Sequence, residues 1–188
     1  MRVIAGSARR TQLKTLEGMN TRPTQDRIKE TLFNMLQYDL ADCTFLDLFA
    51  GSGGIGIEAL SRGAAKAVFV DNSKEALSCI RQNLEKTHLA DRAIVIGQDC
   101  AGAIHALDAK KMHFDIIFMD PPYQLNAEKE VLTAIADSKI ADEDTQIIIE
   151  ATLDREFSED ELACFDVVRV KEYKTNKHIF LQKSSREA

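Results

Sequence analysis

Residues 45–56 read Phe-Leu-Asp-Leu-Phe-Ala-Gly-Ser-Gly-Gly-Ile-Gly. The apolar run Phe45–Phe49 predicts a buried strand, and the residues after the glycines predict a helix from about Ile55 to Ser61. Glycines between a strand and a helix permit a tight turn and a close approach of a ligand to the backbone. We therefore expect a strand, a ligand-binding loop and a helix in direct succession.

The same alternation continues through the rest of the chain. Asn72 is expected to cap the next helix, which runs to about Thr87, with Glu75 completing a capping box. Further strands are expected at 67–70, 93–96, 114–119 and 146–150, and further helices at 101–107 and 128–138. Residues 167–173 and 178–182, joined through Lys174–Lys177, predict an antiparallel hairpin. Continuous apolar strands alternating with helices are typical of a mostly parallel sheet with helices on both faces.

The N-terminal residues form a separate pattern. Strand-like runs at 2–5 and 12–16 flank Gly6–Arg10, which predicts a small β-hairpin with a basic tip. Pro23 and Thr24 are start signals for a helix. We expect three parts: a basic hairpin extension over 1–20, the main domain over 21–183, and a tail over 184–188.

Composition narrows the class of protein. The 188 residues are enough for one domain with a small appendage, and no apolar run approaches the roughly 20 residues of a membrane span. The N-terminus does not resemble a signal peptide. Four scattered cysteines and four scattered histidines predict reduced thiols and no metal site. We expect a cytoplasmic monomer.

Charge is unevenly distributed. Residues 1–29 hold seven Lys/Arg and two Asp/Glu, and residues 169–183 hold five and one, although the whole chain has a net charge of −6. Basic ends on an acidic body predict a local patch that meets phosphate. Within this pattern we interpret Lys174 and Lys177 as a solvated turn.

Four aspartates lie at or near the ends of the first four core strands: Asp47, Asp71, Asp99 and Asp120. Parallel strands with right-handed crossovers place their carboxyl ends on one edge, where ligands bind. Asp47 is well placed for a cationic ammonium group, Asp71 for ribose hydroxyls, and Asp99 for the amino group of adenine. This acidic edge suits S-adenosylmethionine.

A nicotinamide dinucleotide is an alternative, because Gly51, Gly53 and Gly56 satisfy G-x-G-x-x-G. Against it, Asp47 stands four residues before the first glycine, where it favours a cation. A dinucleotide enzyme also needs a hydride-transfer site, and no Tyr/Lys or His/Asp pair stands out as a candidate.

Residues 115–123 read Asp-Ile-Ile-Phe-Met-Asp-Pro-Pro-Tyr, a strand that ends in a stiff proline turn. The turn holds the Asp120 carboxylate, the Pro121 carbonyl and the Tyr123 ring in one geometry. Two acceptors and a ring suit a planar base with an exocyclic amine. A simple structural turn at Pro121-Pro122 is the alternative.

These motifs together resemble the class I S-adenosylmethionine-dependent methyltransferases, which have a Rossmann-like fold with a seven-stranded sheet. The stretches Arg22–Leu36 and Asp47–Leu60, the opening Arg2–Gly6 and the closing hairpin resemble the bacterial 16S rRNA (guanine-N2)-methyltransferase family, called RsmD-like. The resemblance covers nearly the whole chain.

The resemblance implies methyl transfer from S-adenosylmethionine to N2 of a guanine in 16S rRNA. The sequence leaves open whether the substrate is naked rRNA or an assembled or assembling 30S subunit, and the small size of the chain favours the subunit. It implies catalytic residues at Asp120, Pro121, Pro122 and Tyr123. The implied cofactor-binding residues are Asp47, Phe49, Ala50, Gly51, Ser52, Gly53, Gly56, Asp71, Asn72, Asp99 and Cys100. The candidate RNA-binding residues are Arg9, Arg10, Arg22 and Thr24. Arg22 and Thr24 could instead line the cofactor, or Pro23-Thr24 could serve only to start a helix.

Two other classes stay open. A DNA or RNA adenine-N6 methyltransferase could use the same Asp120–Tyr123 chemistry, but no insert large enough to read a DNA sequence is visible. A non-catalytic RNA-binding module is the other class, and the intact acids and glycines argue against it.

Overall fold

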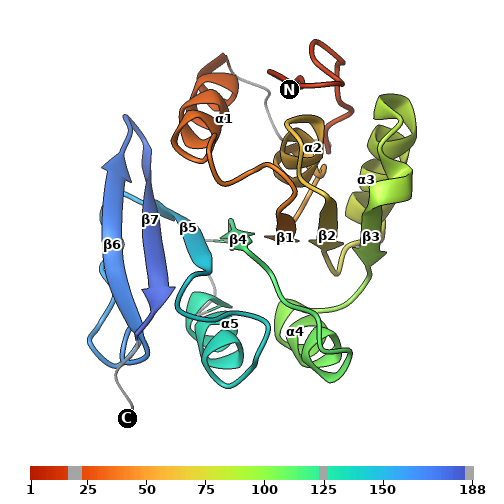
Figure 1. The fold of residues 1–188 in the computed structure, drawn as a ribbon. Coiled ribbons are helices and arrows are strands. Elements are labelled where there is room, and N and C mark those ends of the chain that lie inside the picture. Colours follow the sequence, from red (N-terminus) through yellow and green to blue (C-terminus); the bar gives the residue numbers. More distant parts are fainter. Residues whose placement is uncertain (17–22, 123–126, 185–188) are drawn as a thin grey trace. The chain divides into compact units, whose positions relative to one another are not determined.

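The structure, a computed structural model, describes residues 1–16, 23–122 and 127–184. It contains two compact units, Met1–Gln98 and Asp99–Ala188 (Figure 1). None of the described helices is both long enough and apolar enough to span a membrane.

The first unit is built on three parallel strands in the order β3-β2-β1. They are β1 (Thr44–Leu48), β2 (Lys66–Val70) and β3 (Ala93–Ile96). The interiors of β1 and β2 are buried, as their continuous apolar sequences predicted. Asp47 is the exception, because it is a carboxylate within a buried strand, only 1% exposed.

Three α-helices belong to this unit: α1 (Pro23–Met35), α2 (Gly54–Ser61) and α3 (Lys74–Thr87), with a 3-10 turn at Ala90–Arg92. Figure 1 shows α2 and α3 on one side of β1–β3. The expected cap of α3 was wrong by one residue. Ser73, not Asn72, is the N-cap, and its side chain accepts the Ala76 N–H, while Glu75 accepts the Ser73 hydroxyl.

The N-terminal segment folds back on itself as predicted, but the described residues form no regular strands there. One antiparallel bridge joins Arg2 to Gln12. The backbone N–H groups of Ile4 and Ala5 donate to the Glu58 carboxylate on α2, at 2.8 and 3.0 Å. Three backbone hydrogen bonds also pair the two runs: Val3 N–H to the Thr11 carbonyl, Arg10 N–H to the Val3 carbonyl and Leu13 N–H to the Met1 carbonyl. The Glu58 side chain thus adds to the hairpin pairing and attaches it to α2. The expected division into 1–20, 21–183 and 184–188 stays a prediction.

The second unit holds four strands in the order β4-β5-β7-β6. They are β4 (Ile116–Met119), β5 (Gln146–Thr152), β6 (Phe165–Glu172) and β7 (Asn176–Lys183). β4 is parallel to β5, whereas β7 is antiparallel to both β5 and β6, which confirms the predicted C-terminal hairpin. The seven strands described in the two units confirm the predicted α/β fold class.

Two helices complete this unit, α4 (Cys100–Ala109) and α5 (Ala127–Ala136), and they lie side by side in Figure 1. The Lys183 ammonium on β7 donates to the carbonyls of Ile135, Ala136 and Ser138. Because Lys183 points toward α5, its even-numbered neighbours on β7 point to the opposite face of the strand.

Candidate active site

In the first unit, the side chain of Asp47 on β1 holds the glycine loop in place through a hydrogen bond. The Asp47 carboxylate accepts the Gly56 N–H at 2.8 Å. Burial raises the pKa of Asp47 to about 8, although the Gly56 N–H opposes the shift. A carboxyl group with this pKa ionises readily when a cation arrives, which is the property needed to bind an ammonium group.

The glycines of the loop serve different purposes. A Cβ on Gly56 would lie 2.4 Å from the buried Phe69 ring, so this glycine is required for packing, whereas one on Gly54 would meet the flexible Met1 side chain, whose sulfur lies 2.2 Å away and can move. A Cβ on Gly51 would meet only one atom, the Phe49 carbonyl oxygen at 4.0 Å. Gly51 is therefore the glycine of the loop at which a ligand could approach the backbone.

The backbone of this loop is strained at one non-glycine residue. Phe49 has a φ of 57°, which lies in the left-handed region. Gly51, at 56°, and Gly53, at 76°, lie in the same region. A left-handed Phe costs energy, and such residues concentrate at functional sites. The strain supports the expectation that the loop is a binding element.

Asp71 joins the loop to the end of β2. One of its oxygens accepts the Gly51 N–H at 2.8 Å and the other accepts the Ser73 N–H at 2.9 Å. Each carboxylate oxygen can accept a second bond, so the predicted contact with ribose hydroxyls stays possible. Asp47, Gly51, Gly56 and Asp71 are thus brought together as predicted, whereas Asn72 is exposed beside them.

One residue that fixes the loop was missed in the sequence. Asn83 on α3 is 1% exposed, and its amide donates to the Ser52 carbonyl at 2.9 Å. The same side chain accepts the Lys14 N–H and donates to the Lys14 carbonyl. The Ser52 side chain is itself buried, so only its backbone is placed for a ligand. An Asn on the apolar face of α3 was the available signal.

A buried ionic cluster was also missed. Glu58 on α2 is fully buried and contacts the Lys29 ammonium at 3.2 Å and the Arg62 guanidinium at 2.8 Å. Burial lowers the pKa of Lys29, and the Glu58 charge opposes that shift. Together with the N–H groups of Ile4 and Ala5, these bonds attach the N-terminal segment to α2. An acid inside the otherwise mostly apolar helix Gly54–Ser61 was the signal.

The remaining predicted cofactor residues lie in the second unit. Asp99 is the N-cap of α4 and accepts the Gly102 N–H at 2.7 Å, and Cys100 is buried as the first residue of that helix. Asp99 is exposed, so its other lone pairs face solvent. Its expected role at the adenine amine stays a prediction.

The predicted acceptor residues follow β4 as expected. Asp120 is exposed directly after the buried strand, Pro121 is buried and Pro122 is exposed. Tyr123 and Arg22 lie outside the described residues, as does the side chain of Thr24.

The two candidate RNA-binding residues that are described, Arg9 and Arg10, are exposed in the N-terminal turn.

A polar network that the sequence did not reveal lies on β5 and β7. The His178 ring, 1% exposed, contacts the Glu150 carboxylate at 3.2 Å through Nε2 and the Tyr173 hydroxyl at 3.1 Å through Nδ1. Asn176 donates to the other Glu150 oxygen. Burial and the Glu150 charge raise the pKa of Tyr173 to about 12. Glu150 and His178 are 28 residues apart in the sequence, which hid the network.

Known proteins are similar to this chain over nearly its whole length. A family model described as "Conserved hypothetical protein 95" matches residues 1–182. The chain is 43% identical over 150 residues to "Putative rRNA methyltransferase YlbH" of Bacillus subtilis, covering 80% of this chain and 82% of that protein. It is 34% identical over 156 residues to "Ribosomal RNA small subunit methyltransferase D" of Haemophilus influenzae, covering 82% and 80%. The solved structure of "Putative methyltransferase yhhF" from Escherichia coli superimposes with a TM-score of 0.81 at 30% identity, covering 99% of each chain.

Proposed function

The chain belongs to the Conserved hypothetical protein 95 (RsmD) family, and from this premise we propose that it methylates ribosomal RNA with S-adenosylmethionine. The names of its relatives support the rRNA part of the proposal. More narrowly, we propose N2 of a guanine in 16S rRNA as the acceptor. The observation that carries the proposal is the Asp120-Pro121-Pro122 turn directly after the buried strand β4.

The acidic residues of the first unit fit the cofactor better than they fit a dinucleotide. S-adenosylmethionine supplies an electrophilic methyl group on a sulfonium, and it carries a cationic ammonium and ribose hydroxyls. Asp47 would bind the ammonium with Oδ1, because Oδ2 already accepts from Gly56. Asp71 would accept the ribose hydroxyls beside the open backbone of Gly51. The pyrophosphate of a dinucleotide would offer Asp47 no cation and would meet repulsion from the Asp71 carboxylate.

The other cofactor assignments follow the loop and the start of α4. We assign backbone contacts to the buried Ser52 and to the loop residues Phe49, Ala50, Gly53 and Gly56. Asn72, Asp99 and Cys100 are assigned to the adenosine part of the cofactor.

At the acceptor, the chain's own groups would orient a weak nucleophile. The lone pair of an exocyclic amine is delocalised into the ring, so the nitrogen must be held pyramidal. The Asp120 carboxylate and the Pro121 carbonyl would accept its two N–H bonds and aim the lone pair at the methyl carbon. Asp120 would also be placed to receive the proton that the amine releases once it is methylated. Tyr123 is assigned to stack on the base.

The test uses labelled S-adenosylmethionine and three acceptors: small subunits that lack the modification, naked 16S rRNA, and duplex DNA. We expect the label as N2-methylguanine in rRNA, with subunits preferred over naked rRNA, because a chain this small needs the shape of the particle to select one base. Label in DNA or RNA as N6-methyladenine would overturn the guanine assignment and retain the methyltransferase.

The acceptor role of Asp120 has a matched control on the same strand. Asp115 is exposed at the opposite end of β4. Asp120→Asn is expected to reduce kcat at least about a hundredfold, the size of effect found when one charge-stabilising group is removed from an active site, with an unchanged Kd for S-adenosylmethionine. Asp115→Asn should retain activity. Equal reductions in the two variants, or a parallel loss of cofactor affinity in Asp120→Asn, would count against the role.

A further inference from the structure

The hydrogen bonds around Glu150 all run toward its carboxylate. His178 contacts Tyr173 through one ring nitrogen and Glu150 through the other. A carboxylate can only accept, so Nε2 carries the proton toward Glu150 and Nδ1 accepts from the Tyr173 hydroxyl. Asn176 donates to the second oxygen. The network therefore holds Glu150 in one orientation, with each of its two oxygens next to a hydrogen-bond partner.

Within the described residues, no lysine or arginine forms a salt bridge with this carboxylate, and its neighbour at 3.2 Å is the His178 ring, which is charged only if both ring nitrogens are protonated. The Glu150 side chain is 20% exposed, so it is not sealed in the core. Its two oxygens have spare lone pairs, since each accepts one bond and can accept two. Glu150 is thus a fixed, partly open acceptor, suited to bind an N–H group of a ligand.

Glu150 also lies next to the proposed acceptor residue. β4 and β5 are parallel, and Met119 is in register with Ile149. The residues that follow this last pair are Asp120, directly after the end of β4, and Glu150, within β5 two residues before its end at Thr152. Neighbouring strands lie about 4.8 Å apart, so the two backbones meet at that spacing.

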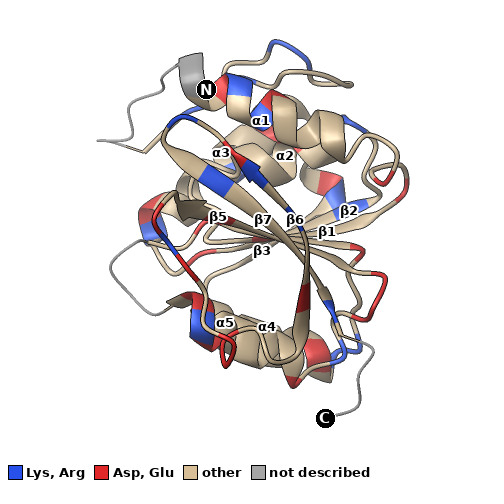
Figure 2. Ribbon diagram, turned by 90° about the vertical axis from the view of Figure 1, so that its left-hand side faces the viewer, with Lys and Arg blue, Asp and Glu red and all other residues tan. Residues whose placement is uncertain are grey.

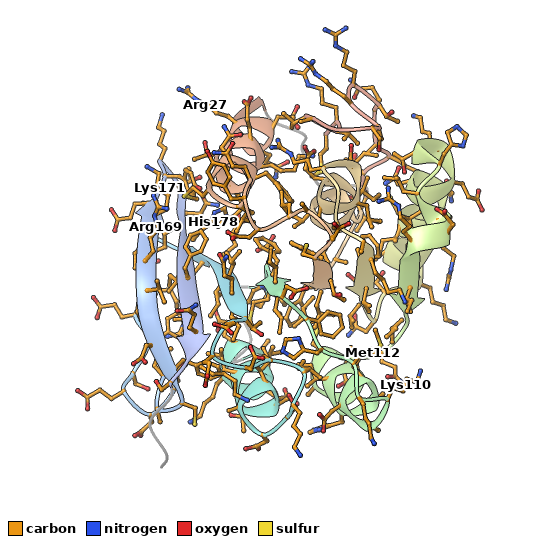
Figure 3. The ribbon with its side chains drawn as sticks, in the orientation of Figure 1. Arg27, Lys110, Met112, Arg169, Lys171 and His178 are labelled. Atoms are coloured by element: carbon orange, nitrogen blue, oxygen red, sulfur yellow. The ribbon has the colours of Figure 1, made fainter. Side chains whose placement is uncertain are left out.

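The two acids share one face of the sheet. Phe118 packs against the His178 ring with centroids 6.0 Å apart, and His178 is paired in register with Glu150. Alternate residues of a strand point to the same face. Asp120 lies one residue past the end of β4, and extending the alternation by that one residue puts it on the face of Phe118. Figure 3 labels His178 on this face of β7, away from α5.

From this placement we infer that Glu150 is a specificity-determining residue that accepts the N1–H of the target guanine while Asp120 holds its N2 amine. The inference rests on the proposed function. Guanine carries a donor at N1 next to the exocyclic amine, whereas adenine has an unprotonated N1 with a lone pair there. A fixed carboxylate binds the first and repels the second, because a buried acceptor without a donor is costly.

The test changes the target base in the RNA as well as the residue in the enzyme. 16S rRNA is ligated to carry either guanosine or 2-aminopurine riboside at the nucleotide that the wild-type protein labels, and is assembled into subunits. 2-Aminopurine keeps the 2-amino group but lacks the N1–H and O6. We expect wild-type kcat/KM to be about tenfold to a hundredfold higher for guanine, the range for a hydrogen bond to a charged group.

The same ratio is then measured for Glu150→Gln and Glu150→Ala. 2-Aminopurine lacks O6 whichever enzyme is used, so a change in the guanine-to-2-aminopurine ratio between the wild type and a variant isolates the contact to N1–H. We expect both variants to lower the guanine preference at least about fivefold, since a neutral amide or a methyl group replaces the charged acceptor. The ratio does not depend on the fraction of folded protein, so partial misfolding does not affect it.

Glu172→Gln is the matched control, because Glu172 is exposed on β6 and is paired in register with Lys177, on the opposite face from His178. Its ratio should equal that of the wild type.

Two results would overturn the inference. The first is equal wild-type use of the two bases, and the second is an unchanged ratio in the Glu150 variants, which would make the network purely structural. Failure of the proposed function looks different, because the wild-type protein would then form no N2-methylguanine.

Discussion

The Asp47 carboxylate accepts a hydrogen bond from the amide of Gly56, 2.8 Å away and nine residues along the chain. This bond connects the end of β1 to the start of α2 and closes the glycine loop between them. It also leaves a buried acid with its pKa raised to about 8 at the base of a proposed cation site.

Cofactor affinity should therefore depend on pH through Asp47. Below pH 8 the carboxyl group of the free protein is mainly protonated, and binding an ammonium would ionise it and release a proton. The affinity for S-adenosylmethionine is expected to rise by up to about tenfold per pH unit from about pH 6 to 7.5. Calorimetry in two buffers of different ionisation enthalpy measures the released proton. In Asp47→Asn the affinity should be weaker and the proton release absent.

The same raised pKa predicts that the free energy of unfolding falls as the pH rises, whereas the affinity for the cofactor increases. The folded-state pKa of Asp47 lies above its value in an unfolded chain, about 4. The raised pKa therefore contributes to the free energy of unfolding fully below about pH 4, and this contribution is lost as the pH rises to about 8. Comparing the free energy of unfolding of Asp47→Asn with that of the wild type from about pH 5 to 8.5 measures it. A constant difference over that range would exclude the raised pKa.

Removing Glu58 should destabilise the protein strongly. Glu58→Ala leaves the buried Lys29 ammonium, the Arg62 guanidinium and two backbone N–H groups without their acceptor. The expected decrease is about 3–5 kcal/mol in the free energy of unfolding, measured with denaturant. Glu85→Ala, an exposed residue on α3, is the control and should change stability by less than about 0.5 kcal/mol.

Asn83 should affect cofactor binding although it is not proposed to touch the cofactor. Asn83→Ala removes the donor to the Ser52 carbonyl and both bonds to Lys14, so the glycine loop loses a fixed anchor. We expect a weaker Kd for S-adenosylmethionine by about tenfold, comparable to the loss of one buried hydrogen bond. Gln82→Ala is the control, because exposed Gln82 contacts only the Lys14 ammonium and the Ser78 hydroxyl among the described residues.

The basic residues of β6 should contribute to RNA binding. Arg169 and Lys171 pair in register with Phe180 and His178, so they share the face of Glu150, and Figure 3 labels them there. Figure 2 colours basic segments along this hairpin. Replacing both with Ala should raise KM for subunits. The slope of log KM against log salt should fall by about 0.7 for each phosphate that these side chains neutralise in the wild type.

Lys110 and Lys111 at the end of α4 provide the charge-matched control for the β6 pair. Lys110 lies well away from β6 in Figure 3. The double Ala variant at these two positions should leave KM and its salt dependence unchanged. An equal effect of the two double variants would indicate a diffuse charge effect and no specific contact.

The strands and helices could be predicted because their signals are local. β3 was predicted at its observed bounds, 93–96, and β1 within one residue at each end, since continuous apolar runs mark strands of a parallel sheet. β3, at the end of the strand order, is only half-buried. The capping error between Asn72 and Ser73 is also local, because both residue types cap helices and only backbone geometry selects one.

The partners of the polar side chains could not be predicted. Glu58 binds Ile4 across 54 residues, Asn83 binds Lys14 across 69, and His178 binds Glu150 across 28. Each contact exists only because packing brings distant segments together, and no local pattern reports it. In the N-terminal segment this packing added the bonds to Glu58 beside the backbone bonds that pair the two runs.

The amino-acid sequence by itself determined the order of strands and helices, the glycine loop, the acids at the strand ends and the Asp-Pro-Pro turn, because each depends on neighbouring residues along the chain. Only the tertiary structure decided that Asp47 is buried under Gly56, that Gly51 is open while Gly56 is required for packing, and that Glu150 is held by His178 beside the end of β4. Burial and hydrogen-bond partners set the charge and orientation of a side chain, and both arise from contacts between residues far apart in sequence.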